Sequence, residues 1–428
     1  MMRKDRRQQR CISPQTEQRV AKTQKKGWAL VRTFASTEEA MRLMARIGVH
    51  TRGIEIMTPK VQHLCILLGD LEGRSATILK QEALAVGAEA AVPWNALEPR
   101  EGGKVLLMGT LHQLRRVCAK LRMQPFSLSE RAEEIERAID GFVCARGKRL
   151  RLPKGDLELG ARPLVMGAVN VTPDSFYDGG RYLDPQVAVS HALSLVSQGA
   201  DILDIGGESS RPGAQPVPVA EEIRRTLPVV DALHEHLISI DTCKPEVAER
   251  AIDAGAAIIN DITALHSPKM TELAAEKQVG VVLMHMQGTP QIMQVSPRYE
   301  DVVEEIAGFL AERADAARSA GIEKERIILD PGIGFGKTAE HNLEILRRLR
   351  EFRSLGYPLL VGVSRKAFIG KVLDLPIEER LEGTLGAVAA AVMNGAEILR
   401  VHDVRECRRA ALVAHAVLNG GLAPPDRE

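Results

Sequence analysis

Eight apolar runs of strand length follow one another between residues 163 and 402, and helical patterns separate most of them. In order, the runs are LVMGAVNV, ILDIGG, ISIDT, AIINDI, VGVVLMHM, RIILDPG, PLLVGVS and ILRVHD. Alternating strands and helices predict a parallel sheet with right-handed crossovers. Eight such units are the number that closes a barrel, so we expect an α/β chain with a (β/α)₈ TIM barrel. An open doubly wound sheet is the alternative.

A polar residue stands at or just after the end of every one of these runs. These residues are Asn170, Asp204, Asp241, Asn260, His285, Asp330, Ser364 and His402. In an open sheet the strand ends would form a line too long to surround one small ligand, whereas in a barrel they form a ring. The pattern therefore favours closure and predicts an active site at this rim.

Three hydrogen-bond acceptors end strands whose residues should be buried: Asp241, Asn260 and Asp330. Buried carboxylates are costly unless they meet donors. One interpretation is that they pair only with strand-end amides and with Lys366. We favour the other, in which they bind a flat heterocycle with several N–H donors.

Positive side chains mark the last two strands. Arg400 and His402 lie two residues apart, so the strand period places both on one face. Lys366 comes just after the seventh strand. Loops after the last barrel strands often bind phosphate, and the three residues predict a phosphate-bearing substrate.

The segment DPGIGFGKT (330–338) resembles a P-loop but lacks its first glycine, because Pro331 stands there. We interpret it as a glycine turn that brings Phe335 over the pocket, where its ring can stack on an aromatic substrate. The loops after the first two strands are long and polar, which indicates lids. Asp178 and Arg211 are their most reactive side chains.

The rest of the chain suggests further divisions. Residues 1–26 carry nine Lys or Arg against two acidic residues and almost nothing apolar, so we expect a disordered tail or, less favoured, an arm for an anionic partner. Residues 27–145 indicate a small α/β accessory domain, with a strand expected in WALVRTF (28–34). Residues 146–162 are expected to be a linker, and residues 163–420 the barrel.

Composition excludes some classes of protein. A net charge of +1 over 428 residues argues against a nucleic-acid-binding protein. The six cysteines are far apart and form no CxxC pair, which indicates free thiols. No apolar run approaches the roughly 18 residues of a membrane span. We therefore expect a cytoplasmic protein with no membrane partner.

Seven motifs in this order resemble the dihydropteroate synthases, over about residues 163–415. They are NVTPDSFYDGG, DILDIGGESSRPGA, SIDT, INDI, DPGIGFGK, GVSRKAF and RVHD. The resemblance implies a barrel enzyme of folate biosynthesis, a transferase. It would condense 6-hydroxymethyl-7,8-dihydropterin diphosphate with p-aminobenzoate to give 7,8-dihydropteroate and diphosphate. It also implies a homodimer through the late barrel helices.

The resemblance also implies a role for each matching residue. The pterin would be bound by Asp204, Asp241, Asn260, Asp330 and Lys366. p-Aminobenzoate would lie among Ser210, Pro212, Phe335 and Ser364. The phosphates would contact Arg211, Arg400 and His402, while Asn170 would hold Mg²⁺ together with the diphosphate. Catalysis would depend on Asp178, Lys366, Arg211 and Asp330.

Two other functions stay open at this point. One is a pterin-binding methyltransferase module of the corrinoid type, which handles no diphosphate and so has no need for SSRPG, SRK or RVH. The other is a non-catalytic relative that only binds pterin.

Overall fold

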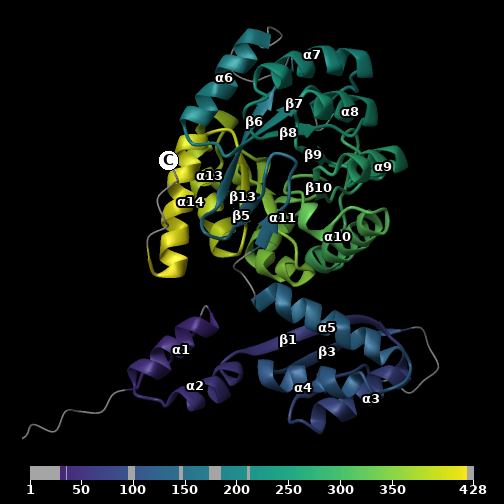
Figure 1. Cartoon of the computed structure of the whole chain (residues 1–428), viewed down its shortest axis with the longest axis vertical. Helices are drawn as coiled ribbons and strands as arrows, with labels where there is room; N and C mark the ends of the chain where they lie inside the picture. The colour runs from purple at the N-terminus through teal and green to yellow at the C-terminus, as the bar shows by residue number, and fades with distance from the viewer. Residues whose placement is uncertain are drawn as a thin grey trace, which may run out of the picture.

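The chain folds into a large barrel and a smaller unit beside it (Figure 1). The structure, a computed structural model, describes residues 29–34, 36–94, 102–143, 148–172, 185–209 and 213–421. The expected basic tail, residues 1–26, lies outside these ranges.

The barrel wall is one parallel sheet with the strand order β11-β10-β9-β8-β7-β6-β13-β12. Its strands are β6 (Leu164–Asn170), β7 (Ile202–Gly206), β8 (Ile238–Asp241), β9 (Ile258–Asp261), β10 (Gly280–Met284), β11 (Ile327–Asp330), β12 (Leu360–Gly362) and β13 (Ile398–Val401). A parallel bridge between Leu329 and Leu359 joins the two ends of this order. The sheet is therefore closed, which confirms the predicted TIM barrel and excludes the open sheet.

Helices surround the barrel on its outside (Figure 1). They are α6 (Pro185–Ser197), α7 (Val219–Ala232), α8 (Pro245–Asp253), α9 (Pro268–Lys277), α10 (Val302–Ser319), α11 (Ala339–Arg348), α12 (Ala367–Leu373), α13 (Leu381–Met393) and α14 (Val404–Asn419). Helix α11 is followed directly by the 3₁₀ helix η4 (Leu349–Leu355). Buried apolar side chains of the sheet and helices form the main core between these two layers.

A second core fills the inside of the barrel at the end where the strands begin. The short strands β4 (Lys148–Leu150) and β5 (Leu157–Leu159) pair as a hairpin whose leucines join this core. Leu152 approaches so closely that a Cβ on Gly280 would lie 2.6 Å from its Cδ2 atom. Part of the segment expected to be a linker thus closes the bottom of the barrel, and the opposite end is left for the site.

The smaller unit is an antiparallel sheet in the order β1-β3-β2 with helices. Its elements are α1 (Thr37–Arg46), α2 (Thr51–Met57), η1 (Thr58–Lys60), β1 (His63–Leu71), α3 (Gly73–Leu84), β2 (Glu89–Ala91), β3 (Gly103–Thr110), α4 (Leu111–Leu121) and α5 (Leu128–Val143). It has a hydrophobic core of its own. The strand predicted in residues 28–34 was wrong for the described part, 29–34. Leu30 and Val31 are 65% and 92% exposed, so an extended chain there has nothing to pack against.

Helix α5 packs against η4 of the barrel. The two backbones come so close that a Cβ on Gly141 would lie 2.5 Å from the carbonyl oxygen of Arg353. The Arg350 guanidinium lies over the Phe142 ring at 5.0 Å. Only glycine permits this approach, so residue 141 is a requirement of the contact between the two units.

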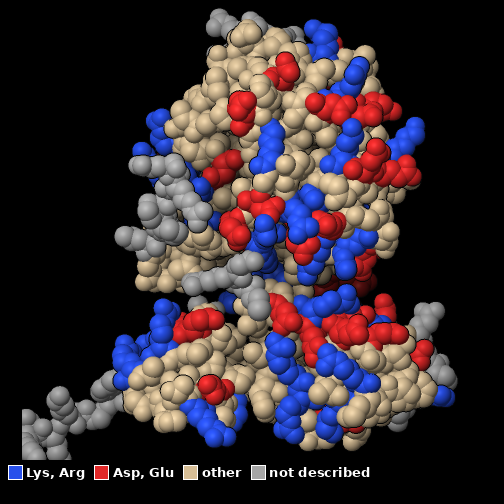
Figure 2. All heavy atoms as spheres, viewed as in Figure 1, with Lys and Arg blue, Asp and Glu red and all other residues tan. Residues whose placement is uncertain are grey.

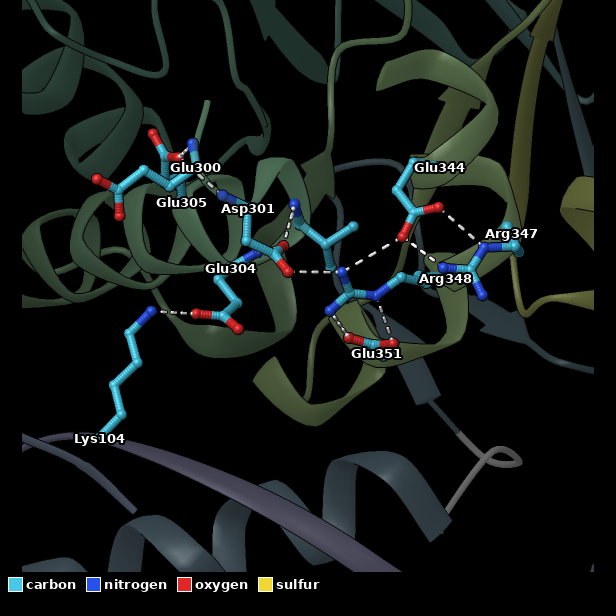
Figure 3. Close-up of polar contacts among 10 residues, drawn as sticks. Lys104, Glu300, Asp301, Glu304, Glu305, Glu344, Arg347, Arg348 and Glu351 are labelled. Atoms are coloured by element: carbon cyan, nitrogen blue, oxygen red, sulfur yellow. Dashed lines mark hydrogen bonds and ion pairs between the residues drawn. The ribbon is translucent and has the colours of Figure 1, made fainter. Parts of the chain in front are cut away.

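A charged contact lies at the side of the same junction. Lys104 of β3 reaches Glu304 of α10, and Arg348 at the end of α11 binds Asp301, which caps α10 (Figure 3). The Lys104 side chain is 65% exposed, so solvent screens this ion pair and it contributes little to stability. The contact between α5 and η4 therefore contributes more to holding the units together.

Positive and negative side chains are interspersed over both units on the face shown in Figure 2. Among the described residues no helix is long and apolar enough to cross a membrane.

Candidate active site

The carboxyl ends of the barrel strands open into a cavity of about 820 Å³. Seven of the residues predicted from the sequence line it: Asn170, Asp241, Phe335, Ser364, Lys366, Arg400 and His402. They come from five different strand ends, so closure of the barrel is what brings them together. The prediction that the strand ends share one cavity is confirmed for these seven.

A buried acidic cluster forms the floor of the cavity through Asp241, which lines it together with Arg400, whereas Asp204, Asn260 and Asp330 lie behind them and are not among the lining residues. Asp204 is fully buried, and its Oδ2 atom accepts from the Arg400 Nε atom at 2.6 Å and from the Asn260 Nδ2 atom at 3.1 Å. The other carboxylate oxygen, Oδ1, is also buried but has no hydrogen-bond donor in the part of the chain that the structure describes. A buried acceptor without a donor is costly, so this atom is suited to receive an N–H group from a ligand.

Asp241 and Asp330 complete the acidic side of the site. Arg400 donates from Nη2 to the Asp241 Oδ2 atom at 2.8 Å. Burial nevertheless raises the pKa of Asp241 to about 7, against the opposing charge of Arg400. Asp330 accepts from the Gly332 backbone N–H at 2.7 Å, and burial raises the pKa of its carboxyl to about 6. Both carboxylates are therefore strong acceptors that a donor-rich ligand can satisfy.

Arg400 lies among the carboxylates. It bridges Asp204 and Asp241, and their charges raise the pKa of its guanidinium against the effect of burial. The sequence predicted only that Arg400 and His402 share one face of their strand. Its predicted contact with phosphate stays a prediction.

His402 is exposed at the rim of the cavity and is held by Ser364. Both its backbone N–H and its Nδ1 atom lie within hydrogen-bond distance of the Ser364 Oγ atom, at 3.3 and 3.1 Å. Ser364 itself is buried. This contact fixes the imidazole at the mouth of the site, where Nε2 points away from the serine contact.

The glycine turn after β11 forms another wall. Gly332, Gly334 and Gly336 all have positive φ, and a Cβ on Gly332 would lie 1.9 Å from the His285 carbonyl oxygen. Only glycine fits there. The turn brings the Phe335 ring to the cavity, with the Lys366 Nζ atom 4.4 Å from its centroid. The sequence interpretation of Phe335 as a pocket residue agrees with this position.

The loop after β10, residues 285–301, also lines the cavity but was not singled out from the sequence. Met293, Gln294 and Pro297 contribute to the lining, and the Gln294 Nε2 atom donates to the Gly334 carbonyl at 2.7 Å. Buried Lys337 was missed too. The unusual length of this loop was the available signal, because connections in such barrels commonly have about two to six residues.

Four predicted site residues lie outside the described residues: Asp178, Ser210, Arg211 and Pro212. The residues on the two sides of Ser210, Arg211 and Pro212 are held by the same side chain. Lys244 donates to the Glu208 carboxylate and to the Val217 carbonyl.

Asn170 is the residue expected to hold Mg²⁺, and its side chain lines the cavity. The described residues contain no cluster of three His, Cys, Asp or Glu side chains that could bind a metal alone. Mg²⁺ commonly takes one or two protein oxygens and completes its shell with water and substrate phosphates. The Asn170 amide oxygen therefore fits an ion that arrives with, or is shared by, a diphosphate.

The sequence of residues 166–402 matches the family described as pterin binding enzyme. The dihydropteroate synthase of Escherichia coli K12 is 48% identical over 262 residues, which are 60% of this chain and 93% of that protein. The crystal structure of Burkholderia cenocepacia dihydropteroate synthase complexed with 7,8-dihydropteroate is 42% identical. The structural match covers 64% of this chain and 97% of the Burkholderia cenocepacia chain, with a TM-score of 0.58.

A third relative extends beyond the barrel. The probable bifunctional folylpolyglutamate synthase/dihydropteroate synthase of Halobacterium salinarum is 41% identical over 401 residues, 92% of this chain but 48% of that protein. An alignment of this length cannot fit within the barrel, so it includes much of the smaller unit.

The chain belongs to the pterin-binding enzyme family. The relatives that it covers almost from end to end are dihydropteroate synthases, and the function predicted from the sequence motifs is confirmed.

Proposed function

We propose that the chain joins a dihydropterin diphosphate to p-aminobenzoate in folate biosynthesis, with the acidic floor as the pterin site. The observation that carries this assignment is the buried, donor-less Oδ1 atom of Asp204 beside Asp241 and Asn260. The edge of a pterin offers several N–H donors in one plane. Asp330 and Lys366 extend the same surface along the pterin ring, which gives a polar site for one flat donor-rich substrate.

The diphosphate would lie at the rim, where His402 and Asn170 line the cavity and Arg400 faces it. Arg211 would contact the phosphates from the second loop. Asn170, together with the diphosphate, would hold an Mg²⁺ ion, which would supply positive charge to the leaving group. An acidic floor, with His402 and Asn170 at the rim of the same cavity, matches a substrate with a donor-rich ring at one end and an anion at the other.

The reaction we propose is S_N1-like. The bond between the pterin methylene carbon and the diphosphate oxygen breaks, and both bonding electrons leave with the diphosphate. His402 and Arg400 stabilise the charge that develops there, an effect that can supply several kcal/mol. Asp178 stabilises the electron-poor carbon. The arylamine nitrogen then forms the new bond to carbon with its lone pair and loses a proton to water, so no protein nucleophile is needed.

p-Aminobenzoate would lie among Ser210, Pro212, Phe335 and Ser364 and would bind after the pterin. The position of the Phe335 ring at the cavity wall, with Ser364 also among its lining, supports this assignment. The corrinoid-type methyltransferase alternative is disfavoured, because such a module handles no diphosphate and has no need for the SSRPG, SRK and RVH segments that this chain carries.

The assignment is tested by mixing the purified chain with pterin diphosphate, p-aminobenzoate and Mg²⁺. One diphosphate should be released for each 7,8-dihydropteroate formed. Binding of the pterin without any release would instead support the non-catalytic alternative.

We also propose that the protein is a homodimer through late barrel helices. An apolar groove between α11, α12 and α13 supports this proposal, with Leu343, Val372 and Leu373 exposed at 44%, 58% and 43%. A groove of this kind on a barrel helix layer is a typical protein contact.

Val372→Glu should convert such a dimer to a monomer, because an unpaired carboxylate in an apolar interface costs several kcal/mol. Mass measured by light scattering checks this. Leu84→Glu, at a residue that is 44% exposed in the smaller unit, should leave the mass unchanged. If Val372→Glu remained a dimer, the interface would have to lie elsewhere on the protein.

The remaining expectations are proposals as well. We infer that residues 27–145 are an accessory domain, which its separate hydrophobic core supports. The hairpin within residues 146–162 belongs with the barrel that we assign to 163–420, since its leucines pack inside the barrel. The cytoplasmic location stays a prediction.

A further inference from the structure

Lys337 is a buried lysine to which the proposed reaction gives no role. It follows the glycine turn, is 3% exposed and borders the cavity. Its Nζ atom lies 2.9 Å from the Phe335 carbonyl oxygen, 3.0 Å from the His285 Nδ1 atom and 3.3 Å from the His285 carbonyl oxygen. None of these three partners is a carboxylate, so the ammonium is held by neutral acceptors alone.

The three contacts match the three N–H groups of an ammonium ion. His285 can accept at Nδ1 because burial and the nearby Lys337 charge lower its pKa to about 3, which keeps the ring neutral. The ring is also held in place by the Phe309 ring, which meets it edge-on at 5.0 Å. A neutral amine has only two N–H groups and would leave one of the three acceptors without a donor.

These contacts tie the glycine turn to the end of β10. Lys337 donates to the Phe335 carbonyl oxygen, while the Phe335 ring faces the cavity and lies next to the Lys366 ammonium group. The Gly332 and Gly336 backbones already lie against His285 and Gln287, so Lys337 joins two segments that touch. Its loss would leave the turn attached at its ends but would free the peptide that carries the ring.

We propose that Lys337 is a positioning residue that holds Phe335 in the place where it contacts the arylamine. This inference rests on the proposed function, because it assigns Phe335 to p-aminobenzoate. Lys337 affects the affinity for the arylamine and leaves the pterin contacts at the floor of the cavity unchanged.

The ammonium form is the one that can make all three contacts, and it titrates near neutral pH. Burial lowers the pKa of Lys337 to about 7, while the charge of Asp330 opposes this and that of Lys366 adds to it. His285 is neutral throughout this range. The third hydrogen bond is therefore present below pH 7 and is lost as the pH rises through that value.

The test measures the KM for p-aminobenzoate at saturating pterin diphosphate between pH 6.5 and pH 8.5. For the wild type we expect this KM to rise several-fold with pH. Lys337→Met should raise it about tenfold at pH 6.5, roughly the value of one hydrogen bond, and should make it independent of pH. The KM for the pterin should change little, and Lys269→Met, at an exposed lysine of α9, should behave as the wild type.

A loss of protein packing alone would change both KM values or the yield of folded protein, but would not remove a pH dependence selectively. If Lys337→Met does not fold, the wild-type profile still decides. A flat wild-type profile, or a folded Lys337→Met with an unchanged arylamine KM, would overturn the inference. A wild-type protein that makes no dihydropteroate would count against the proposed function instead.

Discussion

Arg400→Met will remove nearly all turnover and will also destabilise the protein. The Arg400 guanidinium forms ion pairs with two carboxylates, at 2.6 Å from Asp204 and 2.8 Å from Asp241. Removing one partner of a buried ion pair leaves uncompensated charge, at a cost of about 3 kcal/mol. Loss of a positive group near the leaving diphosphate should lower kcat by about 10² to 10³.

The two effects can be separated by pH. In the variant, Asp241 lacks its positive partner, so its carboxyl group holds a proton to higher pH in the folded protein. The missing stability should therefore be recovered as the pH falls from 8 to 5, while activity stays low. Denaturant unfolding measures the stability, and diphosphate release measures the activity. Arg405→Met, at an exposed position of α14, serves as the matched control, and wild-type activity in Arg400→Met would contradict the assignment.

Asp330→Asn should weaken pterin binding by about 10², which is roughly the value of two charge-assisted hydrogen bonds. The amide oxygen can still accept from the Gly332 N–H, so the glycine turn should keep its shape. What the variant loses is the negative charge offered to pterin N–H donors. Calorimetric titration with the pterin at pH 8 measures the loss.

The same variant has a signature in its pH dependence. Burial raises the Asp330 pKa to about 6, so the wild type should bind pterin less well as the pH falls below 6, and Asp330→Asn should not. A raised carboxyl pKa also means that the folded chain holds this proton more tightly than the unfolded chain. Its contribution to stability is present at low pH and is lost as the pH rises through 6. Asp330→Asn should therefore be more stable than the wild type at pH 8.

Asp315→Asn, at an exposed position of α10, is the control for a simple change of charge. If Asp330→Asn bound the pterin with wild-type affinity and kept the wild-type pH profile, Asp330 would not face the ring.

The barrel, and the residues that lie at its rim, could be predicted from the sequence because both follow from the periodicity of apolar residues. Each strand is a short apolar run, and closure then brings every strand end to one place. Asn170, Asp241 and Ser364 thus share a cavity although they are far apart in the chain. The strand periodicity does not, however, show which group each side chain contacts inside the cavity. Arg400 and His402 share a strand face, yet one contacts carboxylates and the other a serine.

Irregular segments account for most of what was missed. The path of residues 285–301 has no period, so the length of the loop was a signal that it could reach the cavity, but the sequence did not show that Met293 lies there. Lys337 stands in a segment that we interpreted as a glycine turn carrying Phe335, and its partners, two carbonyls and the His285 ring, are contacts that a sequence cannot show. The hairpin below the barrel resembles a linker in composition, because only three leucines of it are buried: Leu150, Leu152 and Leu159.

A crystal structure with a non-hydrolysable pterin diphosphate analogue and Mg²⁺ tests the central claim most directly. We predict a pterin N–H within about 3 Å of the donor-less Asp204 Oδ1 atom, and the diphosphate beside His402 and Asn170 in the same cavity. A pterin ring bound away from Asp204, or a diphosphate in a separate cavity, would contradict the account.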